Sequence, residues 1–274
     1  MKANKKELMK VITVEDNNLK RFVSRYWIFK KTGKDEKIPK LFPMVSTHIL
    51  MHLEDECVFE IIGKKIGERG NQILHPITNI CEVFYGLNTH LIGVELSIQG
   101  YYYLTGDTPE GKIDTIEPLK EVDQDLDRFA GEITEDLAEG NFRKLEDYLK
   151  KRFEIYYTDE DARIVYSAAK EMDRDQKISE LAEKYNISVR TLERKFKKNT
   201  GLTLKKYQLI VRLNKLLEDI YMTENINWSE LALNHGFFDQ AHMISVLKKY
   251  LGKTPNKYLE VRDLIGDLFV IDKR

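Results

Sequence analysis

A segment in the C-terminal half carries side chains suited to hydrogen bonding with the edges of nucleic-acid bases. Arg190, Glu193 and Arg194 are spaced so that on a helix they share one face. Arginine can donate two hydrogen bonds to guanine, and glutamate can accept one from cytosine. Further along, Gln240 and His242 offer related chemistry, since glutamine can pair with adenine. We therefore predict two short helices that read base edges in the major groove of duplex DNA.

Lysines surround both segments and are suited to contacts with the phosphate backbone. Such contacts add affinity and fix the register of a protein on DNA, but they read no sequence. The candidates are Lys195, Lys197, Lys198, Lys205, Lys206, Lys248, Lys249 and Lys253. For any single lysine, a solvated helix face is an equally good interpretation, so the lysines support the prediction only as a group.

The elements that must position these residues form an internal repeat. Residues 178–182 (ISELA) return as residues 228–232 (WSELA), and residues 196–201 (FKKNTG) return as residues 247–252 (LKKYLG). In both copies apolar residues recur at helical spacing on either side of a turn signal. Each copy is therefore predicted to be a helix-turn-helix motif. Two copies in register favour DNA binding over an ordinary helical bundle.

Local signals mark the turn of each motif. In the first copy Asn186 tolerates the left-handed conformation of a sharp turn, and Ser188 suits the N-cap of the next helix. In the second copy Gly236 and Asp239 take these roles. Between the copies, residues 204–221 are predicted to form one helix of about 27 Å, because a helix rises about 1.5 Å per residue. Successive major grooves on one face of DNA lie about 34 Å apart, so we expect one chain to read two of them asymmetrically.

The C-terminal region resembles the AraC family of bacterial transcription regulators over about residues 170–262. The signature Gly-Phe-x-Asp-Gln-x-His occupies residues 236–242, and Lys-Lys-Tyr-Leu-Gly-Lys-Thr-Pro follows at residues 248–255. The resemblance implies a sequence-specific transcription regulator. It implies a structural or phosphate-positioning role for Arg212 in the linker helix. It also implies base reading by Arg190, Glu193 and Arg194 in the first motif and by Gln240, Ala241, His242 and Ser245 in the second.

Two departures from the family pattern affect the second motif. Ser245 stands where the family usually has arginine, and Leu216 replaces the usual small residue of the linker helix. The missing arginine removes a strong contact to phosphate or guanine. We therefore expect the first motif to be the main sequence reader and the second mainly to position the protein.

The charge is divided between the two halves of the chain. The 274 residues hold 44 basic and 45 acidic side chains, for a net charge of −1. Residues 1–161 hold 23 basic and 30 acidic side chains (net −7), and residues 162–274 hold 21 and 15 (net +6). This asymmetry suggests that the second half meets a polyanion, although a chance imbalance of this size is an equally good interpretation.

The first half differs in its spacing of apolar residues, with β-type runs followed by helical segments. Together with the helical second half, this predicts an α+β fold class. Short β-type runs separated by Gly, Pro, Asn and Asp indicate mainly antiparallel sheet at residues 22–29, 47–53, 58–62 and 91–96. After Pro118 the spacing becomes helical, at residues 122–139, 142–157 and 161–174. We predict a β-rich sensing domain (1–118), a helical connector that could mediate dimerisation or pack on its own sheet (119–161), and an all-α DNA-binding domain with two helix-turn-helix motifs (162–274).

The first half also resembles, more diffusely, the sensing domain of one AraC subgroup, which is often cupin-like. The residues that carry this resemblance are Tyr26-Trp27, Phe42-Pro43 and Gln99-Gly100. It implies a β-barrel or sandwich that binds a small effector. The candidate pocket residues are Trp27, Tyr101, Tyr102 and Tyr103, with ordinary core packing as the alternative.

Other functional classes are disfavoured. His48 and His52 would lie about 13 Å apart in a strand, so one metal ion could not bind both. We expect no metal and no cofactor. Cys57 and Cys81 match no metal-ligand spacing and predict a reducing, cytoplasmic location. The longest apolar-looking stretch is shorter than the about 20 residues of a membrane span.

The chain shows no nucleotide-binding or hydrolase motif, so we expect no enzymatic activity. Two alternatives stay open: a DNA-binding domain fused to an enzymatic or redox-sensing N-terminal domain, and an architectural protein without sequence preference. The expected partners are duplex DNA, RNA polymerase, a small-molecule effector and a second copy of the chain, but no membrane.

Overall fold

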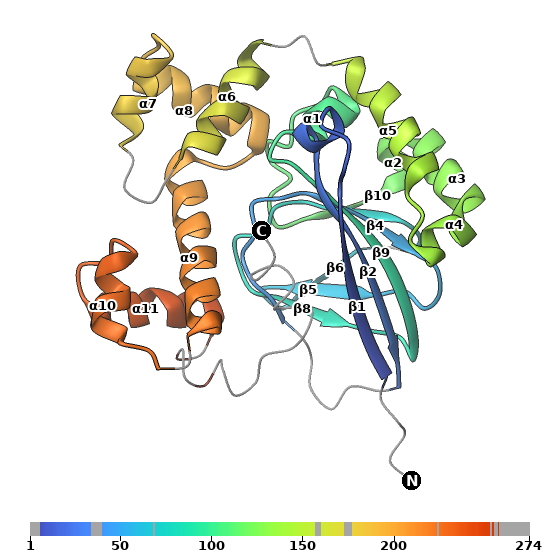
Figure 1. Ribbon diagram of the computed structural model, residues 1–274, viewed down its shortest axis with the longest axis horizontal. Coiled ribbons are helices and arrows are strands. Elements are labelled where there is room, and N and C mark those ends of the chain that lie inside the picture. Colours follow the sequence, from blue (N-terminus) through green and yellow to red (C-terminus); the bar gives the residue numbers. More distant parts are fainter. Residues whose placement is uncertain are drawn as a thin grey trace.

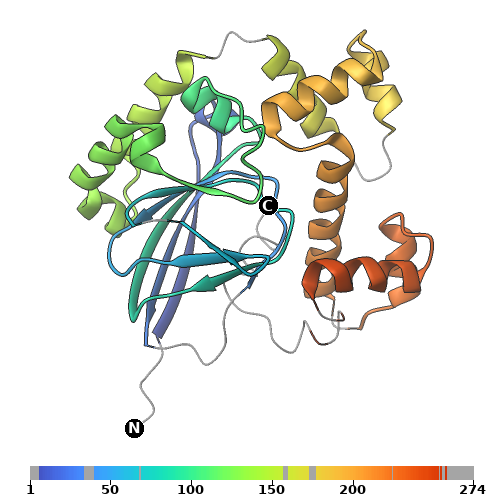
Figure 2. The same ribbon diagram turned by 180° about the vertical axis from the view of Figure 1, so that it is seen from behind.

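The computed structural model of the chain describes residues 6–33, 40–67, 69–156, 160–172, 177–223, 225–252, 254 and 257. A β-rich N-terminal part lies beside an all-helical C-terminal part (Figures 1 and 2). The predicted α+β class is confirmed. None of the helices in the described segments is long and apolar enough to cross a membrane.

Two antiparallel sheets form the centre of the N-terminal part, hereafter the β domain. The larger sheet has the order β1-β2-β9-β4-β7-β10, made of Lys6–Thr13, Val23–Thr32, Asn88–Leu96, His48–His52, Gln72–Leu74 and Ile116–Pro118. The smaller sheet has the order β3-β8-β5-β6, made of Lys40–Leu41, Cys81–Phe84, Val58–Ile61 and Lys64–Ile66. Every strand pair in these sheets is antiparallel. The four β-type runs of the sequence correspond to β2, β4, β5 and β9.

The middle of β2, residues 26–29 (YWIF), is apolar on both faces because both faces are buried there. Side chains alternate between the two faces of a strand. Trp27 and Phe29 lie in the core shared with the smaller sheet, where they join Phe59. Tyr26 and Ile28 lie in a second core, between the larger sheet and the helices that cover it.

Helices of the connector cover the outer face of the larger sheet (Figure 1). They are α2 (Leu119–Val122), α3 (Gln124–Glu132), α4 (Thr134–Glu139) and α5 (Arg143–Glu154), with the short α1 (Gly100–Thr105) nearby. Leu126 of α3, Leu137 of α4 and Leu149 of α5 are all fully buried against the sheet. Of the two roles left open for the connector, packing on its own sheet therefore accounts for these apolar faces.

The continuous helix predicted over residues 122–139 is wrong, because the chain breaks twice there. Asp123 has extended backbone angles and caps α3, its carboxylate accepting a hydrogen bond from the Leu126 amide at 3.0 Å. A second break falls at Ile133, whose backbone is not helical. An aspartate followed by a helical pattern is an N-cap signal that overrides the periodicity.

The C-terminal part consists of six helices within the described residues. They are α6 (Glu160–Glu171), α7 (Ile178–Lys184), α8 (Val189–Thr200), α9 (Leu204–Met222), α10 (Trp228–Asn234) and α11 (Gln240–Leu251). The long α9 stands between two small units, with α7 and α8 at one end and α10 and α11 at the other (Figure 1). Each unit has its own buried core: Phe196 and Leu192 lie in the first, and Met243 and Leu247 in the second.

The β domain contributes apolar side chains to both cores. Phe42, which is 4% exposed, belongs to the core of the second unit. Val45, Ile98 and Ile113 pack against the core of the first unit. The two parts of the chain are thus joined by side-chain packing as well as by the backbone.

Candidate DNA-binding interface

The first helix-turn-helix motif consists of α7, a sharp turn and α8. Asn186 in the turn has φ 52°, the left-handed conformation that asparagine tolerates. Ser188 caps α8, its hydroxyl accepting a hydrogen bond from the Thr191 amide at 3.1 Å. Both local predictions are confirmed. The turn and cap fix the angle at which α8 leaves the motif.

Helix α8 divides its residues between a buried and an exposed face. Leu192 and Phe196 are fully buried. Arg190, Glu193 and Arg194 are exposed, with Arg190 in the first turn of the helix. The N-terminal end of a recognition helix is the part that usually meets base edges. The geometry therefore leaves all three predicted base-reading side chains accessible to a duplex.

The predicted phosphate-contacting lysines do not form a uniform set. Lys198, Lys205, Lys248 and Lys249 are exposed. Lys195 is largely covered and forms an ion pair with Asp161 of α6. The Lys206 ammonium donates to the Tyr250 hydroxyl at 3.3 Å. Lys253 lies outside the described residues.

The second motif, α10 and α11, is built on the same plan. Asn227 caps α10, accepting from the Glu230 amide, and Asp239 caps α11, accepting from the His242 amide at 2.7 Å. Gly236 in the turn has φ 64°. The predicted turn and cap are again confirmed.

The side chains predicted to read bases from α11 differ in accessibility. Ala241, His242 and Ser245 are exposed. Gln240 is half-buried, and its amide oxygen accepts a hydrogen bond from the Ser229 hydroxyl at 3.1 Å. To contact an adenine, Gln240 would first have to exchange this internal partner.

Arg212 of α9 holds the turn of the second motif. Its guanidinium lies over the Phe237 ring, 4.7 Å from the ring centre, and donates to the Gly236 carbonyl at 3.3 Å. Of the two roles implied for Arg212, the structural one accounts for these contacts. His235, directly after α10, makes a second contact between this motif and α9, because its Nε2 lies 2.7 Å from the carboxylate of Asp219 in α9. Phe237 belongs to the family signature, whereas no sequence signal indicated a role for His235 or Asp219.

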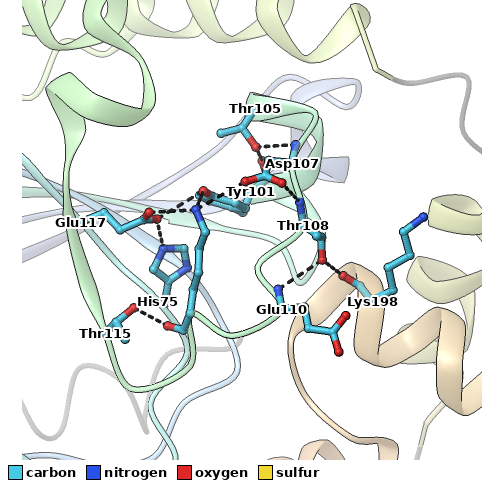
Figure 3. A network of polar contacts seen from close by, with 10 residues as sticks. His75, Tyr101, Thr105, Asp107, Thr108, Glu110, Thr115, Glu117 and Lys198 are labelled. Carbon is cyan, nitrogen blue, oxygen red and sulfur yellow. Dashed lines mark hydrogen bonds and ion pairs between the residues drawn. The ribbon is translucent and has the colours of Figure 1, made fainter.

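A loop of the β domain, residues 107–114, touches the C-terminal end of α8 (Figure 3). The Thr108 hydroxyl donates to the Lys198 carbonyl, and the Glu110 carboxylate lies 3.1 Å from the Lys197 ammonium. A side-chain carbon on Gly201, which ends α8 with φ 73°, would lie only 2.7 Å from the Pro109 carbonyl. Only glycine combines this conformation with so close an approach. Nothing in the local sequence pointed to this contact.

A polar cluster anchors the same loop to the β domain (Figure 3). The Lys112 ammonium donates to the Glu117 carboxylate at 2.8 Å and to the Tyr101 hydroxyl at 2.7 Å. His75 contacts the other oxygen of Glu117. Although burial acts in the opposite direction, hydrogen bonds from His75 and Lys112 lower the pKa of Glu117 to about 2. The carboxylate therefore stays charged and holds the base of the loop.

A cleft of about 680 Å³ lies between the β domain and the first helix-turn-helix unit. Lys20, Arg25 and Glu95 line it from the β domain, and Tyr166 and Lys170 line it from α6. Arg25 and Glu95 form a buried ion pair at 2.6 Å. The cleft therefore combines apolar walls with charged groups from both parts of the chain.

The aromatic residues predicted to line an effector pocket lie in two different cores. Trp27 is 2% exposed between the two sheets, beside a space of only about 10 Å³. Tyr101, Tyr102 and Tyr103 lie on α1 and pack with the core under the connector helices. The structure does not bring the four rings together around a ligand-sized cavity.

His48, Cys57 and Cys81 of the β domain are buried, and His52 is half-buried with both ring nitrogens shielded from solvent. Burial lowers the pKa of His48 and of His52 to about 4, against the opposing charges of Glu95 and Glu56 respectively. Burial also raises the pKa of the Cys57 and Cys81 thiols to about 12. Within the described part of the chain, no three His, Cys, Asp or Glu side chains gather as metal ligands would.

Two helix-turn-helix motifs on one long helix define the class of the C-terminal part as a DNA-binding domain. A family model described as "Helix-turn-helix domain" matches residues 181–260. The Msm operon regulatory protein of Streptococcus mutans is 32% identical over 84 residues, which are 30% of this chain and 29% of that protein. The C-terminal region therefore carries a helix-turn-helix domain of the AraC type, as the signature predicted. The chain aligns with less than a third of the length of this relative.

Solved structures show likeness over different lengths of the chain. The C-terminal domain of AraT, a response regulator from Geobacillus stearothermophilus, is 26% identical and covers 38% of this chain and 86% of its own, with a TM-score of 0.33. ToxT from Vibrio cholerae is 12% identical and covers 93% of this chain and 98% of its own, with a TM-score of 0.44.

Proposed function

We propose that the protein is a sequence-specific DNA-binding transcription regulator in which one chain reads two adjacent major grooves. The observation that carries the proposal is the pair of capped recognition helices, α8 and α11, at the two ends of α9. With 19 residues, α9 is about 28 Å long, close to the about 34 Å that separates successive major grooves. The exposed Arg190, Glu193 and Arg194 supply direct readout at one end.

Selection of binding sites from random duplex DNA tests this proposal. A regulator of this kind selects an asymmetric site that spans about two helical turns, because its two recognition helices differ in sequence. An architectural protein would instead let a random duplex compete as well as any selected one. That result would contradict the proposal.

We further propose that a small ligand in the cleft between the β domain and α6 controls DNA binding. The volume of about 680 Å³ suits a small molecule. Lys20, Lys170 and the Arg25–Glu95 pair provide charged groups to orient it. A thermal-shift screen against metabolites, repeated with Lys170→Ala, tests this idea. A ligand that stabilises both variants equally would bind elsewhere.

The remaining expected partners are part of the same proposal. A homodimer would have to use surfaces other than the apolar faces of α3 and α5, which already pack against the larger sheet. Contact with RNA polymerase would follow from a role in transcription. Size-exclusion chromatography with light scattering measures the first, and a reconstituted transcription assay measures the second.

The alternative of a redox-sensing N-terminal domain receives little support. Thiolates, not thiols, react readily, and burial holds the pKa of Cys57 and Cys81 far above neutral pH. Both cysteines should therefore resist rapid thiol labelling of the folded protein. Fast labelling of either one would revive the alternative.

A further inference from the structure

Phe238 has an unusual position directly before the second recognition helix. With 85% of its surface exposed, it is the most exposed large apolar side chain that the structure describes. It precedes the N-cap Asp239 of α11. An apolar residue at this position commonly packs against the fourth residue of the helix, which here is Met243. Met243 is instead fully buried without it, so the exposed ring has no role in the local packing.

Contacts of the residues on either side fix the backbone at Phe238. Its neighbour Phe237 is 3% exposed and lies under the Arg212 guanidinium, which also binds the Gly236 carbonyl. On the other side, the Phe238 amide lies 3.4 Å from Nδ1 of His242. The exposed ring therefore belongs to an anchored turn at the N-terminal end of α11, three residues before the exposed Ala241.

This end of α11 exposes two apolar side chains and no lysine or arginine. Its exposed residues are Phe238, the N-cap Asp239, Ala241, His242 and Ser245, and the Asp239 carboxylate accepts a hydrogen bond from the His242 amide. The family's usual arginine is absent, since Ser245 takes its place. The C5 methyl of thymine is the apolar group that a base pair presents in the major groove, and alanine and phenylalanine are suited to contact it. The corresponding part of α8 instead carries Arg190, Glu193 and Arg194, which are suited to guanine and cytosine.

We propose that α11 reads thymine methyl groups through Phe238 and Ala241. The second motif is then a sequence reader of a different chemical kind from the first. The two halves of the DNA site then differ in base composition. The half that contacts α8 requires G·C pairs, and the half that contacts α11 requires thymines. This inference rests on the proposed function, since it requires that α8 and α11 both enter major grooves of the same DNA duplex.

The experiment replaces thymine with deoxyuridine, which lacks the methyl group, at single positions of the selected site. Wild-type protein should lose about fourfold in affinity for each contacted methyl, the equivalent of about 0.8 kcal/mol per buried carbon. Phe238→Ala should bind the thymine duplex more weakly and be insensitive to deoxyuridine at the position that Phe238 contacts. Phe238→Leu, which keeps an apolar side chain, should retain part of the sensitivity.

Ile62→Ala provides a matched control, because Ile62 is 76% exposed but lies on the β5–β6 hairpin. It should bind thymine and deoxyuridine duplexes as the wild type does. Thermal unfolding of Phe238→Ala should match the wild type, since the ring is not packed. The inference is overturned if deoxyuridine has no effect on the wild type, or if Phe238→Ala loses the same affinity on both duplexes. A failure to select any site would instead remove the proposed function itself.

Discussion

Lys197 of the first recognition helix forms an ion pair with Glu110 of the β domain, at 3.1 Å between nitrogen and oxygen. Both side chains are about half exposed, at 53% and 47%. An ion pair of this kind contributes only about 0–1 kcal/mol. DNA phosphate can therefore replace Glu110 easily, and the carboxylate acts as a weak competitor for a lysine expected to contact the backbone.

Removing that competitor should strengthen DNA binding. Glu110→Gln is expected to raise affinity about two- to fivefold at low salt, the range that corresponds to a surface ion pair. The gain should shrink as salt screens the charges. Fluorescence anisotropy with a labelled site at several salt concentrations measures both effects. Glu135→Gln, an exposed change on α4, makes the same change in net charge away from α8. An equal gain in DNA affinity in Glu135→Gln would show that net charge, and not release of Lys197 from Glu110, causes the effect.

The exposed arginines of α8 should determine sequence preference. Arg190→Ala and Arg194→Ala should each lose about 1–3 kcal/mol at one base position and relax the preference there. Lys198→Ala should weaken binding to all sequences alike, because a phosphate contact carries no sequence information. Repeated site selection with each variant separates the two patterns. Unchanged preference in both arginine variants would mean that α8 is not the reader.

The helix-turn-helix motifs were predictable because their signals are local. Asn186 and Gly236 mark turns through backbone conformations that few residues tolerate, and Ser188 and Asp239 mark helix starts through their own side-chain oxygens. Each signal acts within a few residues, so it can be read without knowing the fold. The repeat then placed Arg190 and His242 on exposed faces.

Contacts between distant segments were not predictable in this way. The pairing of Glu110 with Lys197 and the insertion of Phe42 into the core of the second unit depend on how the two parts pack. The same holds for Trp27, whose neighbours come from several strands. The break at Asp123 was missed for another reason, because its cap signal lay within an uninterrupted helical pattern.

Arg212 should stabilise the second motif rather than contact DNA. Arg212→Ala removes a cation–π contact and a hydrogen bond, which together are worth about 1–2 kcal/mol. Arg212→Lys should recover only part of this, because an ammonium cannot stack as a guanidinium does. Urea unfolding measures the change, with the exposed Lys205→Ala on the same helix as a control. No loss of stability, combined with a smaller salt dependence of DNA binding, would favour a phosphate contact instead.

Two histidines with buried ring nitrogens, His48 and His52, should make the β domain sensitive to mild acid. Burial lowers the pKa of His48 and of His52 to about 4 in the folded state, while an unfolded histidine titrates near 6.5. The unfolded chain therefore binds more protons between these values, and the free energy of unfolding falls as the pH drops from about 6.5 to about 4. Each histidine contributes a slope of up to about 1.4 kcal/mol per pH unit. Because the pKa of Glu117 is lowered to about 2, this carboxylate reduces the free energy of unfolding further only below about pH 4.5.

His52→Leu tests this prediction, because no ring nitrogen of His52 has a hydrogen-bond partner among the described residues. Urea unfolding at a series of pH values should show a shallower slope between about pH 6.5 and 4 in this variant, because one of the two contributions is removed. Added salt should change the slope little, since the main cause is burial rather than a charged neighbour. A slope identical to that of the wild type would show that His52 takes up its proton without unfolding.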